Sequence, residues 1–84
     1  MRYSTDSPVF AHDCDACVYK GSTYLGEKRL DVYRCEQGGL PTWIARHGSE
    51  GGEYTSLAEK AMTREMAGVT EAWGVLYDFY RSSV

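Results

Sequence analysis

Residues 30–36 read LDVYRCE and decide the fold, because their side chains alternate in a regular way along the chain. In an extended strand, one face would carry Leu30, Val32 and Arg34, and the other Asp31, Tyr33 and Cys35. The preceding residues 16–25, ACVYKGSTYL, are rich in the Val, Tyr and Thr that favour strands. A short Gly-containing segment, GEKR, joins the two runs, and this arrangement predicts a β-hairpin.

A third strand is predicted at residues 42–48, TWIARHG, after a second turn at residues 37–41. One face of this strand would carry Trp43, Ala45 and His47, and the other Ile44 and Arg46. Pairing around the second turn places Cys35 opposite about Trp43. The outer edge of the third strand would then be covered by residues 1–11 or by a second copy of the chain.

After residue 56, the spacing of the apolar residues becomes that of a helix. Ser56 and Glu59 have the spacing of a capping box, in which the serine hydroxyl accepts from the backbone N–H three residues on. Apolar residues then recur every three or four positions, at Met62, Met66, Val69, Trp73, Leu76 and Tyr80. One helix over residues 56–81, and two helices divided at Gly68 (57–67 and 70–81), both fit this stripe.

These elements predict an α+β fold, in which a three-stranded antiparallel sheet packs against a C-terminal helix. The whole chain, residues 1–84, would form one domain. Its sheet would lie within residues 16–47 and its helical part within 56–81, while residues 1–11 would be flexible or extended.

The charge and composition disfavour several classes of protein. The net charge is -3, and Lys28 and Arg29 form the only adjacent basic pair, so no nucleic-acid footprint is visible. No apolar run approaches the roughly 20 residues of a membrane span. The three cysteines are an odd number, and no leader-like apolar stretch follows a basic start, so we expect a cytoplasmic protein with reduced thiols.

Residues 12–17, HDCDAC, are the strongest candidate site. Two cysteine thiolates at this spacing can bind one tetrahedral ion if the loop curls, and zinc accepts three cysteines and one histidine. The best ligand set is His12, Cys14, Cys17 and Cys35. His47 is a weaker fourth ligand, because it would lie about 13 Å along the strand from the residue opposite Cys35.

Two alternatives to zinc stay open for these cysteines. All three could be small apolar core residues, as cysteines outside disulfides often are. A thiol-redox protein using Cys14 and Cys17 is the other alternative. It is disfavoured because a strand, not a helix, follows the pair, and because Asp13 and Asp15 would raise the thiol pKa. No nucleophile elbow, paired-carboxylate motif or phosphate loop indicates an enzyme.

Three segments, HDCDAC, LDVYRC and PTWIARHGSEGGEYTS, resemble a group of small uncharacterised bacterial and phage proteins. The shared pattern is H-D-C-x-x-C followed by P-T-x-I-A-R-x-G, and the resemblance covers residues 12–56. It implies that six residues belong to one pattern: His12, Cys14, Cys17, Cys35, Arg46 and Tyr54. The group has Tyr where this chain has His47, and it implies no function.

We therefore expect a non-enzymatic protein that acts by protein–protein contact, of the kind that phages use to inhibit or modulate a host protein or defence complex. The contact surface would be the sheet face away from the helix, with Tyr19, Tyr33, Trp43, Arg46 and Tyr54. A zinc-stabilised adaptor or nucleic-acid-binding module is the alternative. It would need a basic face, made of Lys20, Lys28, Arg29, Arg34 and Arg46.

Overall fold

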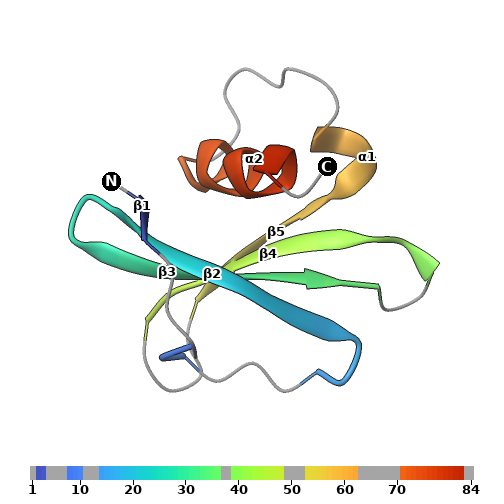
Figure 1. Cartoon of the computed structure of the whole chain (residues 1–84), viewed down its shortest axis with the longest axis horizontal. Coiled ribbons are helices and arrows are strands. Elements are labelled where there is room, and N and C mark those ends of the chain that lie inside the picture. The colour runs from blue at the N-terminus through green and yellow to red at the C-terminus, as the bar shows by residue number, and fades with distance from the viewer. Residues whose placement is uncertain are drawn as a thin grey trace.

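A computed structural model of the chain describes residues 2–3, 8–10, 14–36, 39–48, 53–62 and 71–82. Its strands are β1 (Arg2–Tyr3), β2 (Cys17–Leu25), β3 (Lys28–Cys35), β4 (Thr42–Arg46) and β5 (Tyr54–Ala58). They form one antiparallel sheet in chain order. Two helices follow, α1 (Glu59–Met62) and α2 (Ala72–Ser82), and Figure 1 shows both on the same side of the sheet. The α+β prediction is confirmed, but the predicted count of three strands was too low.

The hairpin of β2 and β3 forms as predicted. Leu25 pairs with Lys28, so Gly26 and Glu27 are the whole turn. Gly26 has a φ of 66°, whereas no residue other than glycine has a positive φ in the part of the chain described. A positive φ at the first turn position alone is the type II′ pattern, which matches the twist of the strands and favours Gly at this position. A bulge between Tyr19 and Gly21 interrupts the pairing and adds Lys20 to β2.

The pairing of β3 with β4 differs from the prediction by one residue. Cys35 lies opposite Thr42, and Arg34 lies opposite Trp43. Because side chains alternate across a sheet, a shift of one residue moves every side chain of the strand to the other face. Trp43 therefore lies on the same face as Leu30 and Val32, not on that of Cys35.

The segment predicted to begin the helix forms a strand instead. Residues 54–58 pair with β4, and Ser56 lies opposite Ile44 within β5, so the capping box is wrong. The long-range pairing with β4 overrides the local capping pattern. The described part of α1 spans four residues, and residues 63–70, between this part and α2, lie outside the described residues. Gly68, Met66 and Val69 lie outside the described residues, so the expected break at Gly68 stays a prediction.

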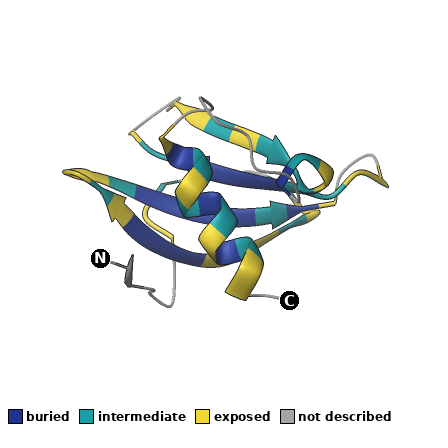
Figure 2. Ribbon diagram, turned by 90° about the horizontal axis from the view of Figure 1, so that it is seen from above, coloured by how far each residue is buried: buried dark blue, intermediate teal, exposed yellow. Residues whose placement is uncertain are grey.

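One face of the sheet, which we call the helix face, packs against α2. Its core contains Leu30, Val32, Trp43 and Ala45 from the strands, with Met62, Ala72, Leu76 and Phe79 from the helices. Met62 and Leu76 are completely buried. Figure 2 shows the buried residues of the central strands beneath α2. Of the predicted apolar stripe, Met62 and Leu76 thus lie in this core and Tyr80 packs against it.

Both edges of the predicted three-stranded sheet are paired with further strands, in a way that differs from the prediction. β5 covers the edge of β4, while β1 pairs with β2 at the opposite edge. The start of the chain therefore lies beside the first long strand and not beside the third predicted one. Neither described helix has the length and the apolar character needed to cross a membrane.

Candidate functional site

Two of the three cysteines face each other where the β2–β3 ladder ends. Cys17 begins β2, Cys35 ends β3, and their Cα atoms are 4.0 Å apart in direct register. The adjacent pair is hydrogen-bonded, because the N–H of Glu36 donates to the carbonyl oxygen of Ala16 at 3.2 Å. Cys17 and Cys35 therefore form a non-hydrogen-bonded pair, the type whose side chains approach most closely.

A tight turn brings the third cysteine to the same place. The N–H of Cys17 donates to the carbonyl oxygen of Cys14 at 3.2 Å, which folds the chain back over Asp15 and Ala16. The three sulfur atoms lie within 4.8 Å of one another. The turn and the end of β3 thus assemble the cluster from residues 14–17 and from Cys35, which is 18 positions further along the chain than Cys17.

The sulfur atoms of Cys17 and Cys35 form a disulfide, and Cys14 stands outside that bond. The expectation that all thiols are reduced is therefore wrong for this state of the protein. The redox alternative, which used Cys14 and Cys17, stays a prediction, but the bond that is present joins Cys17 to Cys35. No helix follows Cys17, which starts a strand, as expected.

The same three sulfur atoms can hold a metal ion when they are thiolates. Zinc–sulfur distances of about 2.3 Å in a tetrahedral site place thiolates about 3.8 Å apart, which is compatible with the observed cluster. The disulfide and the metal exclude each other, because a sulfur atom in a disulfide is no longer a thiolate donor. The same three cysteines thus allow two chemical states, which differ in the distance between the sulfur atoms of Cys17 and Cys35.

The structure brings together three of the four predicted zinc ligands. His12 lies outside the described residues, so its role stays a prediction. His47 is not part of the cysteine cluster: its Nδ1 atom lies 3.5 Å from an oxygen of Glu53. His47 follows the last residue of β4, whereas Cys35 lies opposite Thr42, the first residue of that strand. This position agrees with the lower rank of His47 as a zinc ligand.

The cysteines also belong to a small apolar cluster on the sheet face opposite the helices, which we call the far face. Tyr33, Cys35 and Ile44 are buried there, and Cys14, Cys17 and Tyr19 pack against them. Cys35 is only 4% exposed, whereas Cys14 and Cys17 are half-buried. Burial of Cys35 therefore agrees in part with the interpretation of these thiols as core residues.

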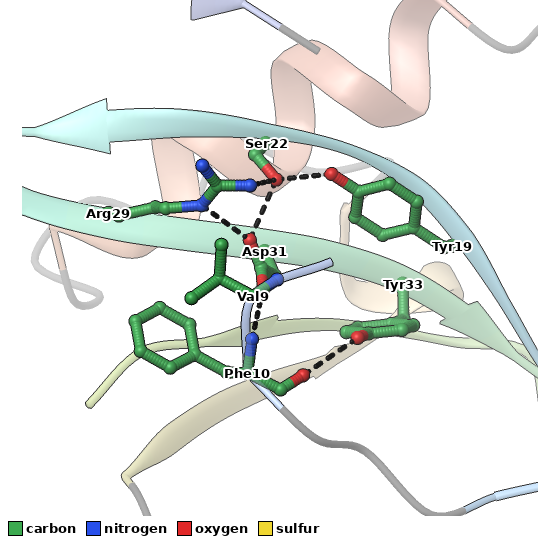
Figure 3. A network of polar contacts seen from close by, with 7 residues as sticks. All are labelled: Val9, Phe10, Tyr19, Ser22, Arg29, Asp31 and Tyr33. Atoms are coloured by element: carbon green, nitrogen blue, oxygen red, sulfur yellow. Dashed lines mark hydrogen bonds and ion pairs between the residues drawn. The ribbon is translucent and has the colours of Figure 1, made fainter. Parts of the chain in front are cut away.

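A buried carboxylate occupies the middle of the far face. Asp31 is fully buried, and its Oδ2 atom accepts hydrogen bonds at 2.7 Å from the backbone N–H groups of Val9 and Phe10. Its Oδ1 atom accepts from the hydroxyl of Ser22 at 2.7 Å and from Nε of Arg29 at 3.0 Å. Figure 3 shows how this carboxylate links residues 9 and 10 to β2 and β3.

These contacts change the acidity of two groups on the far face. Burial raises the pKa of Asp31, but hydrogen bonds from Phe10, Ser22, Arg29 and Val9 together hold it below the ordinary value of 3.8. Burial, and then the negative charge of Asp31, raise the pKa of Tyr33 from 10.0 to about 12. The hydroxyl of Tyr33 donates to the carbonyl oxygen of Phe10 at 3.1 Å, so it adds a second anchor for residue 10.

Sequence reasoning missed the Asp31 network. One local feature of the sequence points to this network: Asp31 lies on the face of the strand that also carries Tyr33 and Cys35. A charged residue between apolar partners must be paired if it is buried. Its partners Val9 and Phe10 lie more than 20 positions away, so spacing alone does not reveal them.

The expected protein-contact surface is only partly correct. Trp43 is 1% exposed and packs in the helix-face core, so its predicted exposure is wrong because of the register shift. Tyr33 is buried as well, while Tyr19 and Arg46 are half-buried. Tyr54 is 60% exposed and lies opposite Arg46, which places it on the far face.

The basic face required by the nucleic-acid alternative is not assembled. Arg29 pairs with Asp31 on the far face, and Arg34 pairs with Glu36 at 2.7 Å and Glu59 at 2.8 Å on the other side of the sheet. Lys20 lies over the ring of Trp43, 6.0 Å from its centroid. Arg29 and Arg34 are thus each paired with acids, and they lie on opposite faces of the sheet.

Comparisons with family models, curated proteins and solved structures find no match to this chain.

Proposed function

We propose that this protein is a small non-enzymatic binding domain in which Cys14, Cys17 and Cys35 hold one zinc ion. The observation that supports this proposal is the convergence of three sulfur atoms within 4.8 Å. Thiolate ligands favour zinc over hard cations such as magnesium and calcium. His12 is the proposed fourth ligand, because zinc sites with four protein ligands are typically structural.

The zinc ion would add a metal cross-link to a turn that backbone hydrogen bonds already join to the hairpin. The carbonyl oxygen of Cys14 accepts from the N–H of Cys17, and that of Ala16 accepts from the N–H of Glu36, both at 3.2 Å. A metal shared by Cys14, Cys17 and Cys35 would fix this turn to both strands of the hairpin. An 84-residue domain buries a modest core, and small domains of this size often use a metal as a staple.

Zinc titration of the reduced protein against a chromogenic chelator tests this role. The proposal expects one zinc ion per chain. The Cys14→Ser and Cys35→Ser variants should lose affinity by more than about 100-fold, because even second-shell changes cost 10- to 100-fold. Asp15→Asn is the matched control, since Asp15 is exposed in the same turn. Equal zinc affinity of Cys14→Ser and Asp15→Asn would refute the site.

We also propose that the domain acts through protein contact on the far face. Three large apolar side chains are exposed on this side, from Val9, Tyr24 and Tyr54, at 61%, 43% and 60%. Tyr24 lies opposite Arg29, and Val9 is anchored on Asp31, so both belong to this face. Exposed tyrosines are typical anchors of protein interfaces. The host-protein target stays a prediction by analogy with small acidic phage proteins.

Cross-linked capture from a host extract tests the far face against the helix face. A Tyr54→Ser variant should lose the captured protein, whereas Val18→Ser should keep it. Val18 is the matched control because it is 60% exposed and lies opposite Arg34, on the helix side of the sheet. Equal capture by both variants would contradict the far face as the contact surface.

A further inference from the structure

We infer that the cysteine cluster is a site of reversible oxidation, at which a peroxide converts the zinc thiolates into the Cys17–Cys35 disulfide and releases the metal. This inference rests on the proposed zinc site and adds the chemistry that empties it. It follows from two observations on the same atoms, a three-sulfur cluster and a bond between two of its members.

The strand register keeps Cys17 and Cys35 together in either state. They are direct partners in a non-hydrogen-bonded position, and the adjacent Glu36–Ala16 hydrogen bond holds the ladder beside them. The ladder continues through Val18–Arg34 and Tyr19–Tyr33. Because the backbone and not the metal sets this approach, the two sulfur atoms remain within reach of each other after the zinc ion leaves.

Exposure indicates which cysteine reacts first. Cys35 is buried, whereas Cys17 is half-buried at the start of its strand, so an oxidant in solution reaches Cys17 more easily. The Cys17 thiolate attacks one peroxide oxygen, and the O–O bond breaks to give a sulfenic acid and hydroxide. The Cys35 thiolate then attacks the Cys17 sulfur, the S–S bond forms, and a second hydroxide leaves.

The electrons balance in this sequence. The two thiolates lose two electrons in total, and the peroxide is reduced to two hydroxide ions, which solvent protons convert to water. Cys14 is not oxidised, and the zinc ion, left with too few ligands, passes to solvent. A dithiol reductant reverses the change by thiol–disulfide exchange, which regenerates both thiols as it becomes a disulfide itself.

Oxidation changes which segments are cross-linked. Zinc would join the turn that carries Cys14 to β2 and β3, whereas the disulfide joins only β2 to β3, which the ladder already pairs. On oxidation, the turn that carries Cys14 therefore loses the zinc–sulfur bond that would attach it to the sheet. Residues 9 and 10 keep theirs, because the Asp31 and Tyr33 hydrogen bonds do not involve sulfur. We expect the effect to be local to residues 14–16.

Peroxide treatment of the zinc-loaded protein tests the inference. Zinc release is followed with a chromogenic chelator, remaining thiols are alkylated, and the chain is cleaved after Lys20, Arg34 and Arg46. We expect zinc release with a linked pair of peptides, in which fragmentation places the bond at Cys17 and Cys35 and the alkyl group at Cys14, because Cys14 and Cys17 share the peptide that ends at Lys20. The Cys14→Ser variant should form the same bond, because it retains both strand cysteines.

The outcomes separate this inference from the proposed function. Zinc binding by the reduced chain, followed by a Cys14–Cys17 bond, an intermolecular bond or no bond at all, would overturn the oxidation site while the zinc site stands. A reduced chain that binds no zinc would overturn both proposals, even if the Cys17–Cys35 bond forms. Release of zinc with the expected bond, restored by a dithiol, supports the inference.

Discussion

The Asp31 carboxylate lies 2.7 Å from the backbone nitrogen of Phe10. This contact attaches Phe10, which precedes the cysteine cluster in the chain, to the far face. The neighbouring N–H of Val9 donates to the same oxygen. Two consecutive backbone donors on one buried carboxylate form a charge-assisted contact, which is stronger than a neutral hydrogen bond. Hydrogen bonds at Asp31 thus attach residues 9 and 10 to the sheet, and the proposed zinc site would attach Cys14 to it as well.

Asp31→Asn should destabilise the fold by about 2–4 kcal/mol near neutral pH, because it removes the charged acceptor and leaves Arg29 without its buried partner. The pKa of Asp31 is lowered in the folded protein, so its contribution is present above the unfolded pKa and is lost as pH falls through the folded pKa. Urea unfolding at a series of acidic pH values should show the two proteins converging below pH 3.8.

Asp78→Asn is the control for this comparison, because Asp78 is exposed on α2. It should change the free energy of unfolding by less than about 0.5 kcal/mol. A constant difference between wild type and Asp31→Asn across the acidic range would show that the Asp31 charge does not stabilise the fold.

Tyr33→Phe should remove an alkaline instability of the wild type. The pKa of Tyr33 is raised from 10.0 to about 12, so its contribution is complete below pH 10 and is lost as pH rises through the folded value. This difference in the pKa of Tyr33 corresponds to about 2–3 kcal/mol in the free energy of unfolding. Absorbance titration of tyrosinate, combined with urea unfolding, measures it. A Tyr33 that ionises near its ordinary value of 10.0 would contradict the prediction.

Ser56→Ala should change the free energy of unfolding by less than about 0.5 kcal/mol, because Ser56 is an exposed strand residue and caps no helix. Loss of a true N-cap would cost about 1 kcal/mol. Thermal and urea unfolding decide between the two structures of this segment. A loss of 1 kcal/mol or more, with reduced helical circular dichroism, would restore the predicted capping box.

Leu76→Ala should cost about 2–5 kcal/mol, because Leu76 is completely buried between α2 and the helix face. Val18→Ala is a suitable control, since Val18 is 60% exposed and should lose less than about 0.5 kcal/mol. Urea unfolding of both variants measures the difference. Similar values for the two would mean that α2 does not cover the sheet as described.

The sequence predicts the local parts of this fold well and the long-range parts less well. Alternation in residues 30–36 and the turn at Gly26 are local signals, and the hairpin they predict is present. The strand at residues 54–58 forms because it pairs with β4. This long-range pairing, which no local pattern reveals, overrides the helical signal of Ser56 and Glu59. Glu59 instead binds Arg34, which is 25 positions earlier in the chain.

The candidate site shows the same division. Cys17 lies at the start of the first predicted strand and Cys35 at the end of the second, which is the open end of the hairpin, and the structure brings both together there with Cys14. The predicted contact surface depended on the register of β3 and β4. An error of one residue there, with Cys35 opposite Thr42 and not Trp43, placed a core tryptophan on the wrong face.

The most direct test of the central claim is the metal content of the reduced protein, measured by native mass spectrometry with and without a chelator. We expect one zinc ion per chain, held by Cys14, Cys17 and Cys35, and a loss of stability when the chelator removes it. A folded chain that carries no metal after full reduction, with three alkylatable thiols and unchanged stability in the chelator, would contradict it.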